Sequence, residues 1–264
     1  MIWLHSYHPQ VILLDLGIIK IYWYGFLVTL TILLSAYFIF RLIKGKEEQK
    51  YLWNLFFYLI IFGLIGARIY HVIFYNLQYF LENPLDILKI WQGGMAIHGA
   101  ILAGIIVTFF YTKKHRLLFW QYSDYLALVL PLGQAIGRWG NYFNQELFGK
   151  PCNYSWCIPI DKINRPLVYQ QNQYFHPVFL YESLLNLLLF IILLFGFKSK
   201  RWPQGMITSV YLISYSIIRF FTEFLRLDSE TIFLSLKPVQ WLCLVIIIIV
   251  LISQKFMYKN REIV

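Results

Sequence analysis

The sequence contains few charged residues and no polar segment long enough to separate two domains. Only 14% of its 264 residues are charged, whereas 59% are hydrophobic. A soluble domain of this length would need a more polar exterior, so the composition argues against an ordinary soluble fold. The apolar residues recur in long runs along the whole chain, which is typical of a polytopic membrane protein rather than of a single anchored domain.

Several chemical motifs are also absent. Residues 1–16 lack a basic start, an apolar run and a small-residue cleavage site, so we expect no cleavable signal peptide. No GxSxG motif and no close set of His, Cys and Asp residues occurs, so we expect no acyl-enzyme, no metal ion and no other cofactor. The three cysteines give little information about function. Cys152 and Cys157 could pair in an oxidising compartment, and Cys243 lies in the last apolar run, where packing is its expected role.

Seven apolar stretches approach the length of about 20 residues that a spanning helix needs. They are residues 20–41, 52–75, 95–112, 120–138, 177–197, 205–225 and 238–257. The fourth is the weakest, because Asp124 and Pro131 interrupt it. The sequence therefore predicts an all-α membrane protein with about seven transmembrane helices. We expect one domain over residues 1–264, with a small extracytoplasmic head region formed largely by the outer loop at about 139–176.

The basic residues are divided unequally between the two sides of a seven-helix layout. Thirteen of the 23 fall on one side, in segments 41–50, 113–116, 198–201 and 255–261, and seven fall on the other. Cytoplasmic loops carry an excess of Lys and Arg, so we expect the N-terminus outside and the C-terminus in the cytoplasm. Topology explains the net charge of +10, and no nucleic-acid partner is expected.

Polar side chains inside such stretches indicate function, because ionisable residues in a membrane are costly. In "QGGMAIHGAILAG", Gln92 to Gly104, the residues Ala96, Ala100 and Gly104 are spaced by four, which predicts a close helix contact. His98 lies off this stripe. An imidazole beside glycine at a helix start could act as a base, although a lone histidine more often packs.

The stretch "AIGRWGNYFNQELFG" places an arginine and several amides near the expected outer membrane boundary. Irregular polar backbone at membrane depth is tolerated only when it is buried in protein or lines a wet cavity. The fork of Arg138 with the amides of Asn141 and Asn144 suits a phosphate or a carboxylate. Glu146 could orient the arginine.

Two later helices carry further polar residues. In "FHPVFLYES", Tyr181 and Glu182 lie about one turn into the fifth helix, where Glu182 needs a partner. The sixth helix carries a drifting polar stripe that lipid would reject, formed by Tyr211, Tyr215, Arg219, Glu223 and Arg226. A single Arg–Glu pair there could be structural. Arg68, in "LIGARIYH", is a weaker candidate nearer the middle of the membrane.

Six motifs in this order resemble those of the phosphatidylglycerol–prolipoprotein diacylglyceryl transferases. They are "YWYGF", which contains Tyr24, "GARIYHVIFYN", "GGMAIHG", "GRWGNYFNQELFG", "HPVFLYE" and "YSIIRFFTEFLR". The resemblance covers nearly the whole chain. It implies an enzyme of the bacterial cytoplasmic (inner) membrane with two substrates, phosphatidylglycerol and a prolipoprotein with a lipobox cysteine. The diacylglyceryl group would move to the cysteine sulfur as a thioether, and glycerol 1-phosphate would leave.

The resemblance also implies roles for individual residues. Arg138 and Arg219 correspond to arginines that contact the lipid phosphate, and His98 corresponds to the histidine of an HGG motif. This sequence departs from the family pattern at Ala100, where the family has a second glycine. It also departs at Val178 and Phe179, which replace polar residues of the family, so no polar substrate contact is expected from them.

The chemistry is consistent with these residues, because a thiol must become a thiolate to attack carbon and two arginines can stabilise the departing phosphate. His98, Tyr215 or a phosphate oxygen could take the thiol proton. Asn141, Asn144, Glu146 and Glu223 are expected to help bind the lipid. A weaker group of candidates comprises Tyr24, Arg68, Tyr181, Glu182 and Arg226.

Three other functions stay open from the residues alone. A transporter could hold an anion with Arg138 and Arg219, but it predicts internal repeats with matched broken helices, which the sequence lacks. A phosphatidyltransferase or phosphatase commonly needs an Asp-rich metal motif, whereas the aspartates near the expected membrane edges lie far apart. A structural membrane protein would use the Arg–Glu pairs only to pack helices.

Overall fold

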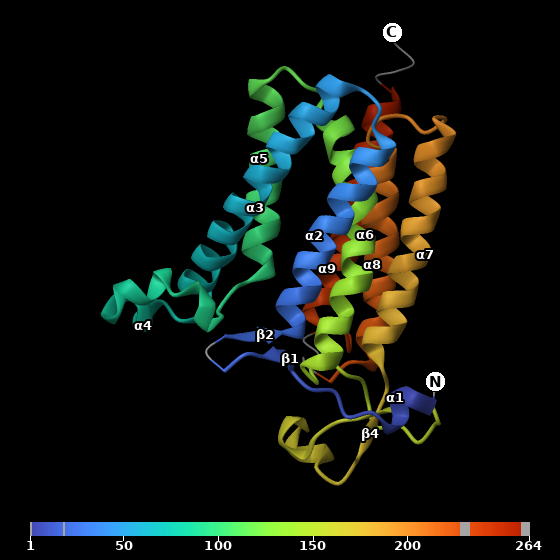
Figure 1. The fold of residues 1–264 in the computed structure, drawn as a ribbon. Coiled ribbons are helices and arrows are strands. Elements are labelled where there is room, and N and C mark those ends of the chain that lie inside the picture. The colour runs from blue at the N-terminus through green and yellow to red at the C-terminus, as the bar shows by residue number, and fades with distance from the viewer. Residues whose placement is uncertain (1, 18, 228–232, 260–264) are drawn as a thin grey trace. The chain divides into compact units, whose positions relative to one another are not determined.

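A computed structural model describes residues 2–17, 19–227 and 233–259 (Figure 1). Helices dominate this part of the chain. The α-helices are α1 (Ile2–Ser6), α2 (Trp23–Leu42), α3 (Lys46–Tyr75), α4 (Leu77–Glu82), α5 (Ile97–Lys114), α6 (Phe119–Phe143), α7 (Val178–Ser199), α8 (Met206–Thr222) and α9 (Pro238–Lys259). Five short 3₁₀ helices are η1 (Pro84–Leu88), η2 (Ile90–Gln92), η3 (Lys162–Asn164), η4 (Leu167–Tyr169) and η5 (Glu223–Leu225).

Each of the seven expected stretches coincides for most of its length with one long helix, so the prediction of an all-α, polytopic membrane protein is confirmed. The first stretch begins in β2 (Lys20–Tyr22), and the sixth ends in η5. By length and composition, α2, α3, α7 and residues 238–255 of α9 can cross a membrane. The helices α5, α6 and α8 are shorter or more polar, and α6 contains Asp124, Pro131 and Arg138. The number of spans therefore stays a prediction.

The chain divides into two compact units. The first comprises Met1–Tyr37 and Leu126–Val264, and the second comprises Phe38–Tyr125. The assignment of the whole chain to one domain stays a prediction. Arg261, which belongs to the basic tail, lies outside the described residues.

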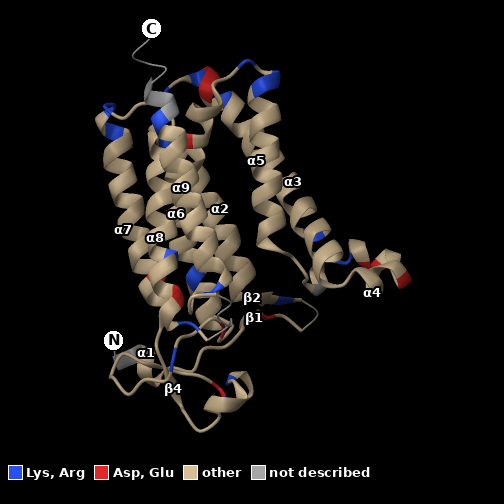
Figure 2. Cartoon of the chain, turned by 180° about the vertical axis from the view of Figure 1, so that it is seen from behind, with Lys and Arg blue, Asp and Glu red and all other residues tan. Residues whose placement is uncertain are grey.

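In the first unit, α8 packs against both α7 and α9. The helix α6 contacts α7 through Ser183, whose hydroxyl donates to the carbonyl of Ala135 at 2.8 Å. Figure 2 shows the basic loop after α7 at the end of this unit opposite the head region. Acidic and basic residues also gather at the other end, where α7 begins.

The head region consists of the segment between α6 and α7 and of the N-terminal residues that pack on it. The segment carries a two-stranded antiparallel sheet, β3 (Ile158–Pro159) with β4 (Tyr174–Phe175), and α1 contacts β3. A second hairpin pairs β1 (Ile12–Asp15) with β2 (Lys20–Tyr22). The sequence prediction began the outer loop at about 139, but α6 continues to Phe143.

Apolar packing and a disulfide fix the head region. Its core includes Tyr142 and Phe143 of α6, Ile160 and Phe175 of the loop, and Phe179 of α7. Such burial of large side chains is the main source of stability in a small region like this. Cys152 and Cys157 form a disulfide, so the pairing that the sequence left open occurs in the structure.

In the second unit, α3 packs closely against α5. A Cβ atom on Gly99 would collide with the carbonyl of Gly66, and one on Gly66 would approach Ala103 to 2.6 Å. The closest approach therefore uses Gly99 and Ala103, not the predicted stripe of Ala96, Ala100 and Gly104. The prediction of a close contact was correct, since the N–H of Ala96 donates to the carbonyl of Ala67 on α3 at 3.1 Å and a Cβ atom on Gly104 would lie 3.7 Å from Leu59. The tightest approach is at the neighbouring Gly99, because glycine there allows the backbones to touch.

Candidate active site

Glu182 lies at the centre of a buried ion-pair network in the first unit. Its carboxylate, on the second turn of α7, is 1% exposed and contacts arginines from two other segments. Arg138 Nε of α6 lies 2.5 Å from Oε2, while Nη1 of Arg219 and Nη1 of Arg226 lie 3.1 and 3.3 Å from Oε1. The hydroxyl of Thr222 donates to Oε1 at 3.2 Å. Residues that are distant in sequence are thereby joined at the start of α7.

Glu223 is the second carboxylate of the network and is also 1% exposed. Arg219 spans both carboxylates, because its Nη2 lies 2.6 Å from Glu223 Oε2. Arg226 Nε is 3.9 Å from the same oxygen, and Lys237 Nζ is 3.4 Å from Oε1. The i, i+4 spacing of Arg219 and Glu223 follows from the helix, whereas the contact with Lys237 comes from the start of α9.

The network carries more positive than negative charge. Among the described residues, four cations, Arg138, Arg219, Arg226 and Lys237, face two carboxylates, Glu182 and Glu223, so these six groups have two more positive than negative charges. The side chains of the cations are only 3–18% exposed. Buried charges are unfavourable unless they are paired, so an excess of cations among these groups favours binding of an anion.

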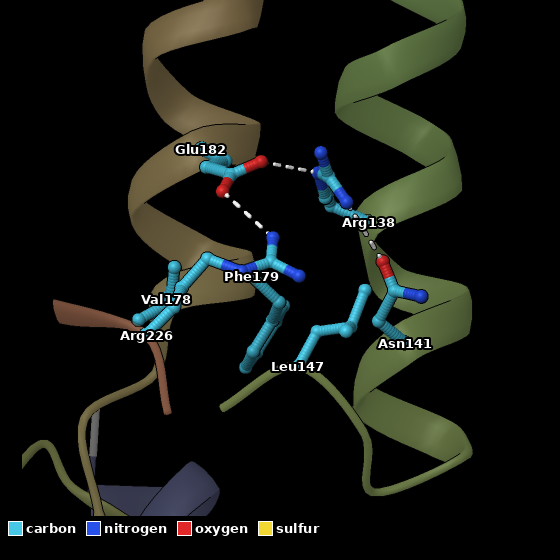
Figure 3. Close-up of a pocket in the computed structure, with 7 residues that line it drawn as sticks. All are labelled: Arg138, Asn141, Leu147, Val178, Phe179, Glu182 and Arg226. Carbon is cyan, nitrogen blue, oxygen red and sulfur yellow. Dashed lines mark hydrogen bonds and ion pairs between the residues drawn. The ribbon is translucent and has the colours of Figure 1, made fainter. Parts of the chain in front are cut away.

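Figure 3 shows a small pocket at the network, with Arg138, Glu182 and Arg226 directed into it. Arg138 Nη1 donates to Asn141 Oδ1 at 3.2 Å, which fixes the orientation of the guanidinium. Val178, Phe179 and Leu147 provide an apolar wall. The expectation that Val178 and Phe179 make no polar contact with the substrate stays a prediction.

Glu146 acts on Arg138 only through an amide. Its Oε1 accepts hydrogen bonds from Asn141 Nδ2 at 2.8 Å and from Asn144 Nδ2 at 3.3 Å. The direct carboxylate partner of Arg138 is Glu182 instead. Arg138, Asn141, Asn144 and Glu146 are thus close together, as expected, but the sequence did not specify which of them contact each other.

The candidate tyrosines belong to the first unit. The ring of Tyr215 stacks on Tyr211 with centroids 5.9 Å apart, and the ring of Tyr24 packs where a Cβ atom on Gly140 would lie. The hydroxyl of Tyr181 contacts His176 Nδ1 at 3.2 Å and accepts from Trp156 Nε1 at 3.1 Å. Burial lowers the pKa of the His176 imidazole below its usual value, because the charged form loses hydration.

His98 and Arg68 belong to the second unit. His98 is exposed at the start of α5, and its ring lies 5.7 Å from that of Tyr70. Arg68 is 7% exposed and donates to the carbonyls of Asp86, Ile87, Gly93 and Gly94 at 2.6–3.0 Å. These four contacts occupy the guanidinium, so Arg68 fixes the loop that precedes α5.

The sequence analysis did not identify Lys237 as a site residue and counted it only among the basic residues of the loops. It also left Glu182 without a named partner. A lysine directly before a proline-initiated apolar helix is a weak signal for such a role. Among the described residues, no group of three or more His, Cys, Asp and Glu side chains is placed to hold a metal ion. The expected absence of a cofactor stays a prediction.

Comparison with known proteins shows the family of the chain. The sequence pattern of the prolipoprotein diacylglyceryl transferase family matches residues 11–254. The chain belongs to this family. It is 42% identical over 229 residues to the phosphatidylglycerol–prolipoprotein diacylglyceryl transferase of Synechococcus elongatus, covering 84% of this chain and 78% of the relative. It is 43% identical over 239 residues to the enzyme of that name from Thermotoga maritima, and the match covers 89% of this chain and 80% of the relative.

Proposed function

We propose that the protein transfers the diacylglyceryl group of phosphatidylglycerol to the lipobox cysteine of prolipoproteins and releases glycerol 1-phosphate. The family and the names of relatives at about 40% identity support this activity. The observation in this chain that carries the proposal is the buried network, in which four cations and two carboxylates of the described residues meet. A phosphate group is the anion that such an arginine-rich site suits best.

The reaction replaces a carbon–oxygen bond by a carbon–sulfur bond. The cysteine sulfur attacks the glyceryl carbon, the bond from that carbon to the phosphate oxygen breaks, and the thiol proton goes to a base. The phosphodiester carries one negative charge, and the departing phosphate monoester approaches two. Arg138 and Arg219 bind the phosphate and stabilise this increase in charge, which is where electrostatic stabilisation is most effective.

Polar residues beside the two arginines complete the lipid site. Asn141 orients Arg138, and Glu146 fixes Asn141 with Asn144. Glu182 and Glu223 hold the guanidinium groups at a fixed separation, and Arg226 adds positive charge beside Glu182. The substrate cysteine supplies the nucleophile, so the enzyme needs no nucleophile of its own.

The proton acceptor is His98, Tyr215 or a phosphate oxygen. His98 is the favoured group, because an imidazole accepts protons at neutral pH and this one is exposed at a helix start. A tyrosine would first have to lose its own proton, which is unfavourable near pH 7.

The protein lies in the bacterial cytoplasmic membrane, with the N-terminus and head region outside and the C-terminus in the cytoplasm. The unequal distribution of basic residues supports this orientation. It places the network at the outer membrane surface, where a secreted prolipoprotein can present its cysteine.

An assay with the purified protein in detergent tests the proposed function. Phosphatidylglycerol and a lipobox peptide are added, and the mass of the peptide is followed. Addition of one diacylglyceryl group is expected, and a peptide in which serine replaces the cysteine should stay unmodified. If wild-type protein leaves the cysteine peptide unmodified in phosphatidylglycerol micelles, the proposal is wrong. Uptake of an anion into proteoliposomes in that case would favour a transporter.

A further inference from the structure

The ammonium group of Lys237 contacts three oxygens of the short turn from Glu223 to Arg226. Its Nζ is 3.0 Å from the carbonyl of Glu223, 2.7 Å from the carbonyl of Arg226 and 3.4 Å from Glu223 Oε1. The side chain is 10% exposed. The turn follows the end of α8, where backbone carbonyls lack helical partners, and a lysine satisfies such carbonyls well.

Two further contacts hold Lys237 in place relative to this turn. Its backbone N–H donates to Gln240 Oε1 at 2.9 Å, which closes the first turn of α9. Gln240 Nε2 in turn donates to the carbonyl of Phe220 on α8 at 3.1 Å. The ammonium group therefore has a defined position rather than the mobility of a surface lysine.

The contact between Lys237 and Glu223 places a positive charge beside a carboxylate of the site. Glu223 orients Arg219 through one oxygen, Oε2, and meets Lys237 through the other, Oε1. Without Lys237, the six described groups of the network would lose one of their four positive charges, while both carboxylates would remain. Glu223 would then neutralise much of the positive charge of the arginine that it orients.

We propose that Lys237 is a positioning residue of the active site that neutralises Glu223, so that Glu223 can orient Arg219 while the charge of Arg219 stays available to the phosphate. The proposal rests on the proposed function. Because charge accumulates on the phosphate as it leaves, the loss of one positive charge raises the reaction barrier more than it weakens substrate binding.

The first test is Lys237→Met in the peptide-modification assay, with rates given per folded enzyme. A fall in kcat of at least tenfold is expected, while KM for phosphatidylglycerol changes by less than threefold. Lys162→Met is the matched control, because Lys162 is an exposed residue of the head region, and its kcat should stay within threefold of wild type. Lys237→Gln, which keeps a hydrogen-bond donor but no charge, replaces the methionine variant if that variant does not fold.

A double-mutant cycle with Glu223→Gln separates this role from a structural one. When Glu223 is already neutral, nothing is left for Lys237 to neutralise, so Lys237→Met should lower kcat by less than threefold in that background. The contacts of Lys237 Nζ with the two backbone carbonyls do not depend on the Glu223 carboxylate, so their loss in Lys237→Met should lower the melting temperature in both backgrounds.

Two results would overturn the proposal. One is a kcat of the Lys237→Met variant within threefold of wild type. The other is an equal loss of kcat with and without the Glu223 carboxylate, which would make Lys237 purely structural. Either result leaves the proposed function intact, because wild-type activity in the same assay tests that function separately.

Discussion

Replacing Arg138 by lysine separates phosphate binding from helix packing. In the structure, Arg138 Nε pairs with Glu182 and Nη1 donates to Asn141, which directs the rest of the guanidinium into the pocket. A lysine ammonium is one nitrogen and cannot hold the carboxylate, the amide and a phosphate in the same geometry. The substitution therefore keeps the positive charge and removes the planar arrangement of hydrogen-bond donors.

The expected cost lies in the transition state. Loss of one well-placed, charge-assisted contact to the leaving phosphate is worth about 3 kcal/mol, by analogy with removal of one oxyanion donor. This corresponds to a fall in rate of about a hundredfold. Stability should change little, because Arg219 and Arg226 still pair with Glu182 and the lysine keeps a positive charge near it.

The assay measures turnover of folded, detergent-purified Arg138→Lys with phosphatidylglycerol and the lipobox peptide. Arg165→Lys is the matched control: its guanidinium donates to the carbonyls of Ile160 and Gln170 in the head region, so turnover should stay near wild type. If Arg138→Lys keeps activity within about threefold of wild type, a difference under ~1 kcal/mol, the guanidinium geometry is not needed and the phosphate-binding role is refuted.

The other predictions concern the base, the topology and the disulfide. His98→Gln should lower turnover strongly while binding of phosphatidylglycerol persists, and near-normal turnover of a folded variant would remove His98 from the mechanism. A cysteine introduced at Lys162 should react with an impermeant reagent added outside cells, whereas strong labelling at Lys200 would overturn the orientation. Joint replacement of Cys152 and Cys157 by alanine, which opens a loop with a separation of five residues, should destabilise the head region by roughly 2 kcal/mol. An unchanged melting temperature would contradict this estimate.

Local sequence patterns were enough to predict the elements. Each apolar stretch became a helix, because a run of apolar side chains in a membrane must satisfy its backbone internally. The stretch 120–138 was judged weakest because of Asp124 and Pro131, yet α6 is continuous through both. The end of α6 was placed too early, since Asn141 and its neighbours read as a loop but lie in the last turn of the helix.

Pairing between helices was less predictable than the helices themselves. The four-residue spacing of Arg219 and Glu223 correctly indicated one face of α8, and their ion pair follows from it. The predicted small-residue stripe on α5 faces α3, but the tightest approach is at Gly99, because it depends on which glycine meets the glycine of the facing helix. Spacing within one helix does not carry that information.

The sequence by itself determined that this chain is a helical membrane protein with arginines, amides and carboxylates at defined helix ends, because the cost of polar groups in an apolar run is a local property. Its motifs also indicated the family. Only the tertiary structure decided that Glu182 forms ion pairs with three arginines. It also decided that Asn141 links Glu146 to Arg138 and that Lys237 is the fourth cation of the network. These contacts join α6, α7, the turn after α8 and the start of α9. They depend on how the helices pack around one another, which no single segment specifies.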